Sequence, residues 1–409
     1  MKKIFLLTLL SFLLTSTISA DINLKPSFLW KKLMGPSKEE ETLKKILGIK
    51  AVIKEDPENY ADYEALSIAY DRIGLYEKSI AALKTAIKYY PEDENDEDFL
   101  YGNLARAYII IKELDKAKDA LDKAMKINPN NAVNAVHLAQ YHIMKKQYKQ
   151  AASAMKRDSD LSNKEDIYFD WYRYIFFDLG IDSSKAIDLF KYVVELDPKS
   201  NDARRTFATA IRGDLDNLEN DFSRIIEEYK KALNCRPNHV LTHICIADTY
   251  MFMAFKTKDE SYNEIALEWF GKAFEINPKH EQLFYAIANF YNYNEKHDEA
   301  ILKLKEAILL GFNDEHMMET LARAYNNKAY SLYQEGKDLN KGLEVIEKAI
   351  SLSPNNGIIL STKAELLYKM GKFEEAYTYI KRGIILEPEH LEIQQDFKMI
   401  EEALGKANK

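Results

Sequence analysis

The chain has 409 residues, of which 46% are hydrophobic and 30% are charged, so it carries enough apolar material for a continuous core. Its formal net charge is −8, and an acidic chain without clustered cations is not expected to bind nucleic acid. Its two cysteines cannot build a disulfide scaffold. These numbers exclude a disordered tail, a nucleic-acid-binding protein and a small disulfide-rich domain.

The first twenty residues have the layout of a secretory signal peptide. Two lysines precede an apolar run at 4–14, and a small, mildly polar stretch follows up to Ala20. The run is too short to cross a bilayer, so we expect cleavage between Ala20 and Asp21 and no membrane span afterwards. An uncleaved anchor is the alternative. The Met-Lys-Lys start predicts bacterial export to the periplasm, outer envelope or outside, and residues 21–36 are predicted to be a linker.

Prolines then mark a repeat of about 34 residues. Pro57 and Pro91 are 34 residues apart, and so are Pro354 and Pro388. A fixed period of this length indicates an array of identical folding units rather than two or three globular domains. Because proline cannot continue a helix interior, each of these prolines is expected to end one helix.

The content of the units predicts two helices in each. The first unit carries Tyr63, Leu66, Ser67, Tyr70, Gly74, Tyr76, Ser79, Leu83 and Ala86 at positions 4, 7, 8, 11, 15, 17, 20, 24 and 27. Spacings of three and four are typical of amphipathic helices. Small residues at positions 8, 20 and 27 let the two helices approach closely, while the aromatic residue at position 11 fills the remaining space.

This pattern resembles the tetratricopeptide repeat family. Nine units fit between residues 57 and 388, and they start at Tyr60, Asp98, Ala132, Ile167, Asn201, Val240, Glu281, about Arg323 and Gly357. The resemblance implies an all-α solenoid of helix–turn–helix units wound into a right-handed superhelix. We expect a capping helix at 37–56 and a solvating C-terminal helix and tail at 389–409, since solenoids must cover their end faces.

Some units depart from the family pattern. The fourth unit puts Asp170 at position 4, where the first, second, seventh and ninth units have an aromatic or apolar residue. Units five, six and eight need insertions around residues 215–220, 256–262 and 313–320 to stay in phase. We expect these insertions to lengthen helices or turns without changing the fold.

No catalytic constellation, glycine-rich phosphate loop or cofactor motif is apparent, so we predict no enzyme activity, no cofactor and no metal. His239 and His243 are one helical turn apart, with His280 one unit later, and a metal bound there is the weaker alternative. Cys235 and Cys245 are expected to be buried thiols, with a disulfide between them as the alternative.

The resemblance also implies that positions 2, 5, 9 and 12 of each first helix line a concave groove. A spacing of 3, 4 and 3 does place these positions on one helical stripe. In units four and five they include Tyr168, Trp171 and Arg205. In units seven to nine they are polar and aromatic: Gln282, Tyr285, Asn289, Asn292, Asn327, Ser331, Gln334, Ser361, Glu365 and Tyr368.

Six of these side chains are candidate peptide contacts: Tyr168, Trp171, Arg205, Tyr285, Asn289 and Asn292. Asparagine amides offer both a donor and an acceptor to an extended main chain, and aromatic rings supply much of the affinity at such surfaces. The alternative is that Trp171 and other apolar groove positions pack against a neighbouring helix, or that the register is slightly shifted.

Three functional hypotheses follow. The first is a non-enzymatic module that binds a protein or peptide of the bacterial envelope through the concave face. The second is a scaffold or assembly factor of an envelope or secretion complex that uses the convex face. The third is an accessory or metal-dependent enzyme using the three histidines.

Overall fold

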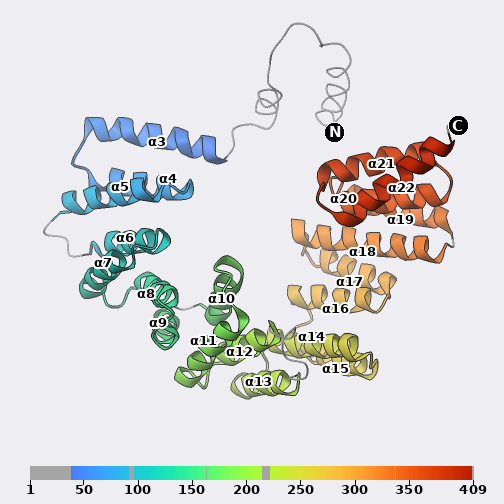
Figure 1. Cartoon of the computed structure of the whole chain (residues 1–409). Helices are drawn as coiled ribbons and strands as arrows, with labels where there is room; N and C mark the ends of the chain where they lie inside the picture. The colour runs from blue at the N-terminus through green and yellow to red at the C-terminus, as the bar shows by residue number, and fades with distance from the viewer. Residues whose placement is uncertain (1–37, 92–95, 163, 214–221, 337, 408–409) are drawn as a thin grey trace, which may run out of the picture. The chain divides into compact units, whose positions relative to one another are not determined.

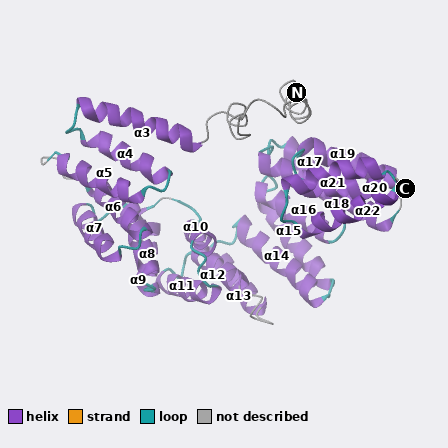
Figure 2. Cartoon of the chain, turned by 45° about the horizontal axis from the view of Figure 1, so that its top comes forward, coloured by secondary structure: helices purple, strands orange, loops and turns teal. Residues whose placement is uncertain are grey.

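The computed structural model describes residues 38–91, 96–162, 164–213, 222–336 and 338–407. The predicted signal peptide with its cleavage site at Ala20 and Asp21, the linker at 21–36 and the insertion at 215–220 lie outside the described residues. Within the described ranges the chain forms twenty α-helices and one π-helical turn and no strand (Figures 1 and 2). The chain is therefore all-α, as the sequence predicted.

The chain divides into two compact units, residues 1–164 and 165–409. The first unit holds α3 (Lys38–Glu55) and three antiparallel helix pairs: α4 (Tyr60–Arg72) with α5 (Tyr76–Tyr89), α6 (Asp98–Ile110) with α7 (Leu114–Ile127), and α8 (Ala132–Met144) with α9 (Tyr148–Leu161).

The second unit begins with α10 (Ile167–Arg173), the π-helical turn η1 (Tyr174–Asp178) and α11 (Ser183–Leu196). Its further pairs are α12 (Asn201–Gly213) with α13 (Phe222–Cys235), α14 (Val240–Thr257) with α15 (Ser261–Ile276), α16 (Glu281–Tyr293) with α17 (His297–Leu309), α18 (Glu315–Glu335) with α19 (Leu339–Leu352), and α20 (Gly357–Lys369) with α21 (Phe373–Leu386). The last helix is α22 (Leu391–Ala407).

Small residues allow the two helices of a pair to pack closely. Position 20 or 27 of the units is occupied by alanine, serine or glycine without exposed area at Ser79, Ala86, Ala117, Ala124, Ala300, Ala307 and Ala376. Gly357 of α20 and Gly383 of α21 approach closely, since a Cβ on residue 383 would lie 3.1 Å from the Gly357 carbonyl oxygen. These positions bring the backbones together, and larger residues around them form the core.

A left-handed residue ends the first helix at position 15 of five units: Gly74, Lys112, Lys146, Glu295 and Gly371. The next amide then donates back across the helix end, as Glu113 N–H does to the Tyr108 carbonyl oxygen at 2.9 Å. Such a bond satisfies a carbonyl group that would otherwise lack a partner at the helix end. The same turn therefore joins the two helices whether or not glycine is present.

Two of the expected insertions lengthen first helices. Helix α14 has 18 residues and α18 has 21, whereas α16 and α20 have 13. Asp314 caps the added first turns of α18, because its carboxylate accepts the Met317 N–H at 2.8 Å. Helix α18 therefore begins at Glu315, eight residues before the expected unit start near Arg323.

The terminal helices differ in how well they are buried. On α22, Ile393 and Ile400 are buried against α20 and α21, with Phe397 packed beside them. On α3, Ile46 is buried against Leu66, Ala69 and Tyr70 of α4, and Thr42 is buried as well. The expected apolar face of α3 is partly open, since Leu43 and Leu47 are 44% and 69% exposed.

Candidate functional site

The structure buries the predicted groove residues of units four and five. Tyr168, Trp171 and Arg205 are 1%, 5% and 2% exposed, so they do not form an open peptide-binding surface. In α10 and the η1 turn that follows it, the apolar stripe of Tyr168, Trp171 and Ile175 is buried, and Asp170 is exposed at position 4. Because an unpaired aspartate is costly to bury, the helix turns the stripe expected in the groove toward its neighbours. Trp171 is therefore a packing residue, as the alternative prediction stated, and not a groove residue.

Arg205 is part of a buried ion-pair network. Its guanidinium lies 2.9 Å from Asp166 and 2.8 Å from Asp202, and it stacks 4.7 Å from the centre of the Phe169 ring. Asp202 also accepts the Tyr168 N–H at 2.7 Å. Arg205 therefore fastens the start of α10 to α12, which accounts for its burial.

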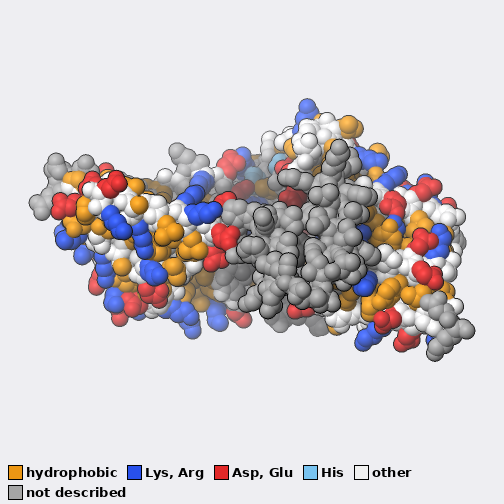
Figure 3. Space-filling model, turned by 90° about the horizontal axis from the view of Figure 1, so that it is seen from above, with side chains coloured by type: hydrophobic (Ala, Val, Ile, Leu, Met, Phe, Trp, Pro, Cys, Tyr) orange, Lys and Arg blue, Asp and Glu red, His pale blue; other side chains and the backbone are white. Residues whose placement is uncertain are grey.

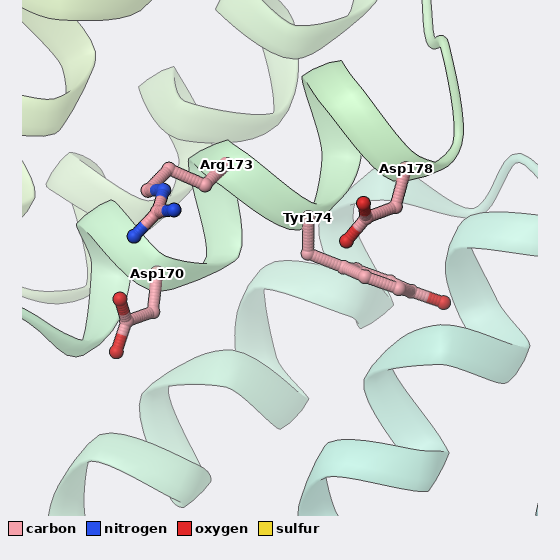
Figure 4. Close-up of a pocket in the computed structure, with 4 residues that line it drawn as sticks. All are labelled: Asp170, Arg173, Tyr174 and Asp178. Atoms are coloured by element: carbon pink, nitrogen blue, oxygen red, sulfur yellow. The ribbon is translucent and has the colours of Figure 1, made fainter. Parts of the chain in front are cut away.

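A cavity of about 450 Å³ lies beside α10 and η1. Figure 4 shows the four residues that line it, Asp170, Arg173, Tyr174 and Asp178. All four residues come from one helical segment. The cavity therefore lies against the polar side of α10 and η1, opposite the buried apolar stripe.

The predicted contacts on α16 are accessible. Asn289 is exposed, and Tyr285 and Asn292 are partly exposed. The Tyr285 hydroxyl donates to Asp314 at 3.2 Å, and burial together with this carboxylate raises the pKa of Tyr285 to about 12. The Asn292 amide oxygen lies 3.2 Å from His297 Nδ1. These contacts orient Tyr285 and Asn292, and the Asn289 amide has no hydrogen bond within the described chain.

On α18 the groove positions are shifted by one residue from the predicted ones. Gly336, with φ of 67°, is the left-handed residue at the helix end, whereas the expected unit start at Arg323 would put position 15 at residue 337. The unit of α18 therefore starts at Ala322. Asn327, Ser331 and Gln334 do not occupy the groove positions, which belong instead to Asn326, Tyr330 and Tyr333.

The sequence contains a signal for this shift that the proline spacing conceals. Tyr325 and Ala329 are buried, and they match the aromatic or apolar residue at position 4 and the small residue at position 8 of other units. One extra residue in the turn before α19 restores the register of the second helix. Asn326 is 8% exposed, and its amide oxygen has no hydrogen-bond partner among the described residues.

On α20 the groove positions are Ser361, Glu365 and Tyr368. The Ser361 hydroxyl donates to Asp396 of α22 at 2.8 Å. Burial, and then the neighbouring charges of Asp396 and Glu392, raises the pKa of Glu365 to about 8. A carboxyl group in this setting is largely protonated at neutral pH, because no cation compensates its burial.

Positions 5, 9 and 12 of three consecutive first helices thus form one surface, which we call the polar face: Tyr285, Asn289, Asn292, Asn326, Tyr330, Tyr333, Ser361, Glu365 and Tyr368. The helices α16, α18 and α20 that carry it pack side by side (Figure 1). Elsewhere, the described surface in Figure 3 intersperses basic and acidic side chains. The polar face combines amides, hydroxyls and rings in a regular array, which suits an extended peptide.

Two of the three histidines have hydrogen-bond partners, and the buried Nδ1 of His280 has none among the described residues. His239 Nδ1 lies 2.8 Å from the Thr242 hydroxyl, and His243 Nδ1 lies 3.0 Å from the His239 carbonyl oxygen. Burial, and then Arg205, lowers the pKa of His239 to about 4, and burial also lowers the pKa of His280. Within the described ranges no group of three or more histidine, cysteine or acidic side chains is placed to hold a metal ion.

The cysteines are both free thiols. Cys245 is partly buried, and burial raises its pKa. Cys235 is exposed rather than buried, because it is the last residue of α13. The two side chains therefore differ in their access to solvent.

Comparison with known proteins identifies the repeats. A family model described as Tetratricopeptide repeat matches residues 63–93, 100–131 and 322–356. The chain therefore contains tetratricopeptide repeats in both of its compact units.

Two curated proteins are similar over long stretches. A TPR repeat-containing protein of Methanocaldococcus jannaschii is 22% identical over 340 residues, which cover 81% of this chain and 57% of that protein's length. Response regulator aspartate phosphatase E of Bacillus subtilis is 24% identical over 284 residues, covering 64% of this chain and 73% of that protein. Among solved structures, a tetratricopeptide repeat protein from Parabacteroides merdae aligns with 14% identity and a TM-score of 0.34, covering 84% of this chain and 98% of that one.

Proposed function

Because the chain contains tetratricopeptide repeats, we propose that it is a non-enzymatic binding module for a protein or peptide of the bacterial envelope. Binding takes place on the concave side of the repeats, through the polar face of α16, α18 and α20. The repeats supply a long surface for shape and hydrogen-bond recognition, and the partner supplies an extended segment.

The observation that carries this proposal is the regular spacing of polar side chains on three adjacent helices, two of which have amide groups without a hydrogen bond within the described ranges. Asn289 is exposed without an intramolecular bond, and the Asn326 amide oxygen lacks a partner among the described residues. Tyr330 is 41% exposed on α18, the helix that lies between α16 with Asn289 and α20 with Glu365. A peptide main chain provides one donor and one acceptor per residue, which is what such an array needs to be satisfied.

The test is selection of binders from a random peptide-display library with Asp21–Lys409 as bait, followed by titration of the selected peptides. We expect Asn289→Ala to lower affinity by about threefold to tenfold, the value of one hydrogen bond. Asn340→Ala on α19 is the matched control, because it removes an exposed amide from a second helix. Equal affinity for both variants, or no peptide selected, would contradict the proposal.

Export is the second part of the proposal. It is supported by the signal-peptide pattern of residues 1–20, which lie outside the described residues. Separately, no described helix has the length and apolarity needed to cross a membrane. Amino-terminal sequencing of the protein recovered from the periplasm or medium of a bacterial host should read from Asp21, and a retained Met1 would contradict cleavage.

A scaffold that uses the outer helices is the alternative, and exposed leucines favour it. Leu302 and Leu309 on α17 are 64% and 88% exposed, and Ile385 on α21 is 70% exposed. Exposed apolar groups on second helices are suited to a protein interface. A partner that is lost with Leu302→Ser and Leu309→Ser but kept with Asn289→Ala would select this alternative.

A further inference from the structure

Three carboxylates at the C-terminal end of the polar face have no counter-ion. Glu365 of α20 and Glu392 and Asp396 of α22 take part in no ion pair among the described residues. Other carboxylates of the same repeats are neutralised, as Glu347 is by Lys363. Glu365, Glu392 and Asp396 thus lie at this end of the face without a paired cation among the described residues.

Tyrosine rings stand beside these carboxylates. The rings of Tyr330 and Tyr333 lie 5.8 Å apart on α18. Burial, followed by Glu365 and Asp396, raises the pKa of Tyr333 to about 12, which shows that ring and carboxylates share one environment. Lys369 does not neutralise them, because its ammonium is bound by the Tyr333 carbonyl oxygen and lies 4.7 Å from that ring.

We propose that Glu365, Asp396 and the Tyr333 ring bind a lysine or arginine side chain of the partner's peptide segment. This inference rests on the proposed function and names the chemistry of the partner. A guanidinium or ammonium forms charge-assisted hydrogen bonds with carboxylates and is attracted to the face of a tyrosine ring. Its aliphatic stem also packs on the ring.

A second observation on α18 points to a bound segment. Asn326 lies one turn before Tyr330 on the same stripe, and its amide oxygen is buried without a partner among the described residues. A buried acceptor without a hydrogen bond is costly. A peptide N–H placed beside the basic side chain would satisfy it, so the acceptor and the carboxylates fit one ligand with donors along its length.

The charged groups around Glu365 come from every packed helix. From α18 the Tyr333 ring lies near Glu365, and α22 contributes Glu392 and Asp396, with His390 near Asp396. Lys363 of α20 is engaged elsewhere, by Glu347 of α19 and Tyr379 of α21. A bound cation favours the ionised form of Glu365, so binding releases a proton at neutral pH.

The experiment compares peptide selection by the chain and by its Glu365→Gln, Asp396→Asn variant, using the same random library. We expect the unchanged chain to enrich peptides with lysine or arginine at one fixed position. The variant should lose that enrichment and bind the selected peptides about tenfold or more weakly. Glu347→Gln on α19 is the matched control, because it removes a carboxylate outside the polar face, and it should leave the enrichment unchanged.

The outcomes separate this inference from the proposed function. Peptides selected without a preferred basic residue, or bound equally by the double variant, would overturn the basic-partner inference while leaving peptide binding intact. Failure to select any peptide would overturn both. Loss of binding through misfolding is recognised because the circular dichroism spectrum and thermal midpoint would change together.

Acidity gives an independent readout. A selected basic peptide should bind about tenfold more tightly at pH 8.5 than at pH 6.5, because Glu365 loses its proton in this interval while the peptide stays charged. Glu365→Gln should abolish the difference. Equal affinity at both pH values in the unchanged chain would contradict the role of Glu365.

Discussion

The Arg205 guanidinium lies 2.9 Å from the Asp166 carboxylate, so α12 holds the residue that precedes α10. Asp166 is itself left-handed, with φ of 59°. The ion pair thus fixes the entry of the chain into the second compact unit. It also explains why a residue expected in a groove is buried.

Arg205→Ala should destabilise the second unit by about 3 kcal/mol. Removing one partner of a buried pair leaves the other charges uncompensated, and partial exposure of Asp166 places the loss at the low end of the usual range. Urea unfolding followed by circular dichroism measures the change.

Arg236→Ala is the control for that variant. Arg236 pairs with the neighbouring Glu165 at 3.3 Å, but both side chains are mostly exposed. Exposed pairs contribute about 0 to 1 kcal/mol. Equal losses for the two arginines would show that burial of Arg205 is not what matters.

Glu365→Gln should make stability less dependent on pH. Burial, then Asp396 and Glu392, raises the pKa of Glu365 from 4.5 to about 8, so the folded chain holds this proton more tightly than the unfolded chain. The contribution of protonated Glu365 to the free energy of unfolding is complete below pH 4.5 and is lost as the pH rises through about 8. Between pH 5.5 and 8.5 the unchanged chain should lose roughly 2 kcal/mol more than the variant, allowing for partial exposure.

The measurement is urea unfolding at several pH values in that interval. Glu344→Gln on α19 serves as the comparison, because Lys341 lowers the pKa of Glu344 through a hydrogen bond and the side chain is exposed. Parallel pH profiles for the unchanged chain and Glu365→Gln would contradict the assignment.

Lys112→Gly should stabilise the turn between α6 and α7. Lys112 has φ of 64°, a conformation that costs residues with a Cβ about 1 kcal/mol and glycine little. We expect a gain of about 0.5 to 1 kcal/mol in thermal or urea unfolding. Lys118→Gly in the middle of α7 should lose about 1 kcal/mol, because there glycine only weakens the helix.

Gly383→Ala should destabilise the last repeat by about 1 kcal/mol. The added methyl group would meet the Gly357 carbonyl oxygen at 3.1 Å, so α20 and α21 must move apart. Gly271→Ala on α15 meets no heavy atom within 4 Å and should instead gain about 0.5 to 1 kcal/mol from helix propensity. A loss for both variants would contradict the packing argument.

The all-α repeat fold was predictable from the sequence, because prolines and small residues recur at fixed positions and each unit contacts mainly its neighbours. The helices α4, α6, α16 and α20 begin at the residues where units were expected to start. The residue at which each of these helices begins follows from the local spacing of the repeat. The fold class therefore required no knowledge of long-range contacts.

The candidate site was predictable only in part. Tyr285, Asn289 and Asn292 lie in a unit without insertions, so their positions on the helix followed from the period. The burial of Arg205 depends on Asp166, 39 residues earlier, and no local pattern encodes that pair. Tyr330 and Tyr333 were missed because one extra turn residue displaces α18 from the proline-based register.

That extra residue has an evolutionary consequence. An α-helix turns by about 100° per residue, so inserting one residue into a turn exchanges the whole stripe that a first helix presents. In α18 this replaces Asn327 and Ser331 by Asn326 and Tyr330, while α19 keeps its place. A repeat array can thus acquire a new specificity through a short insertion in a loop, provided that core positions such as Ala329 follow the new register.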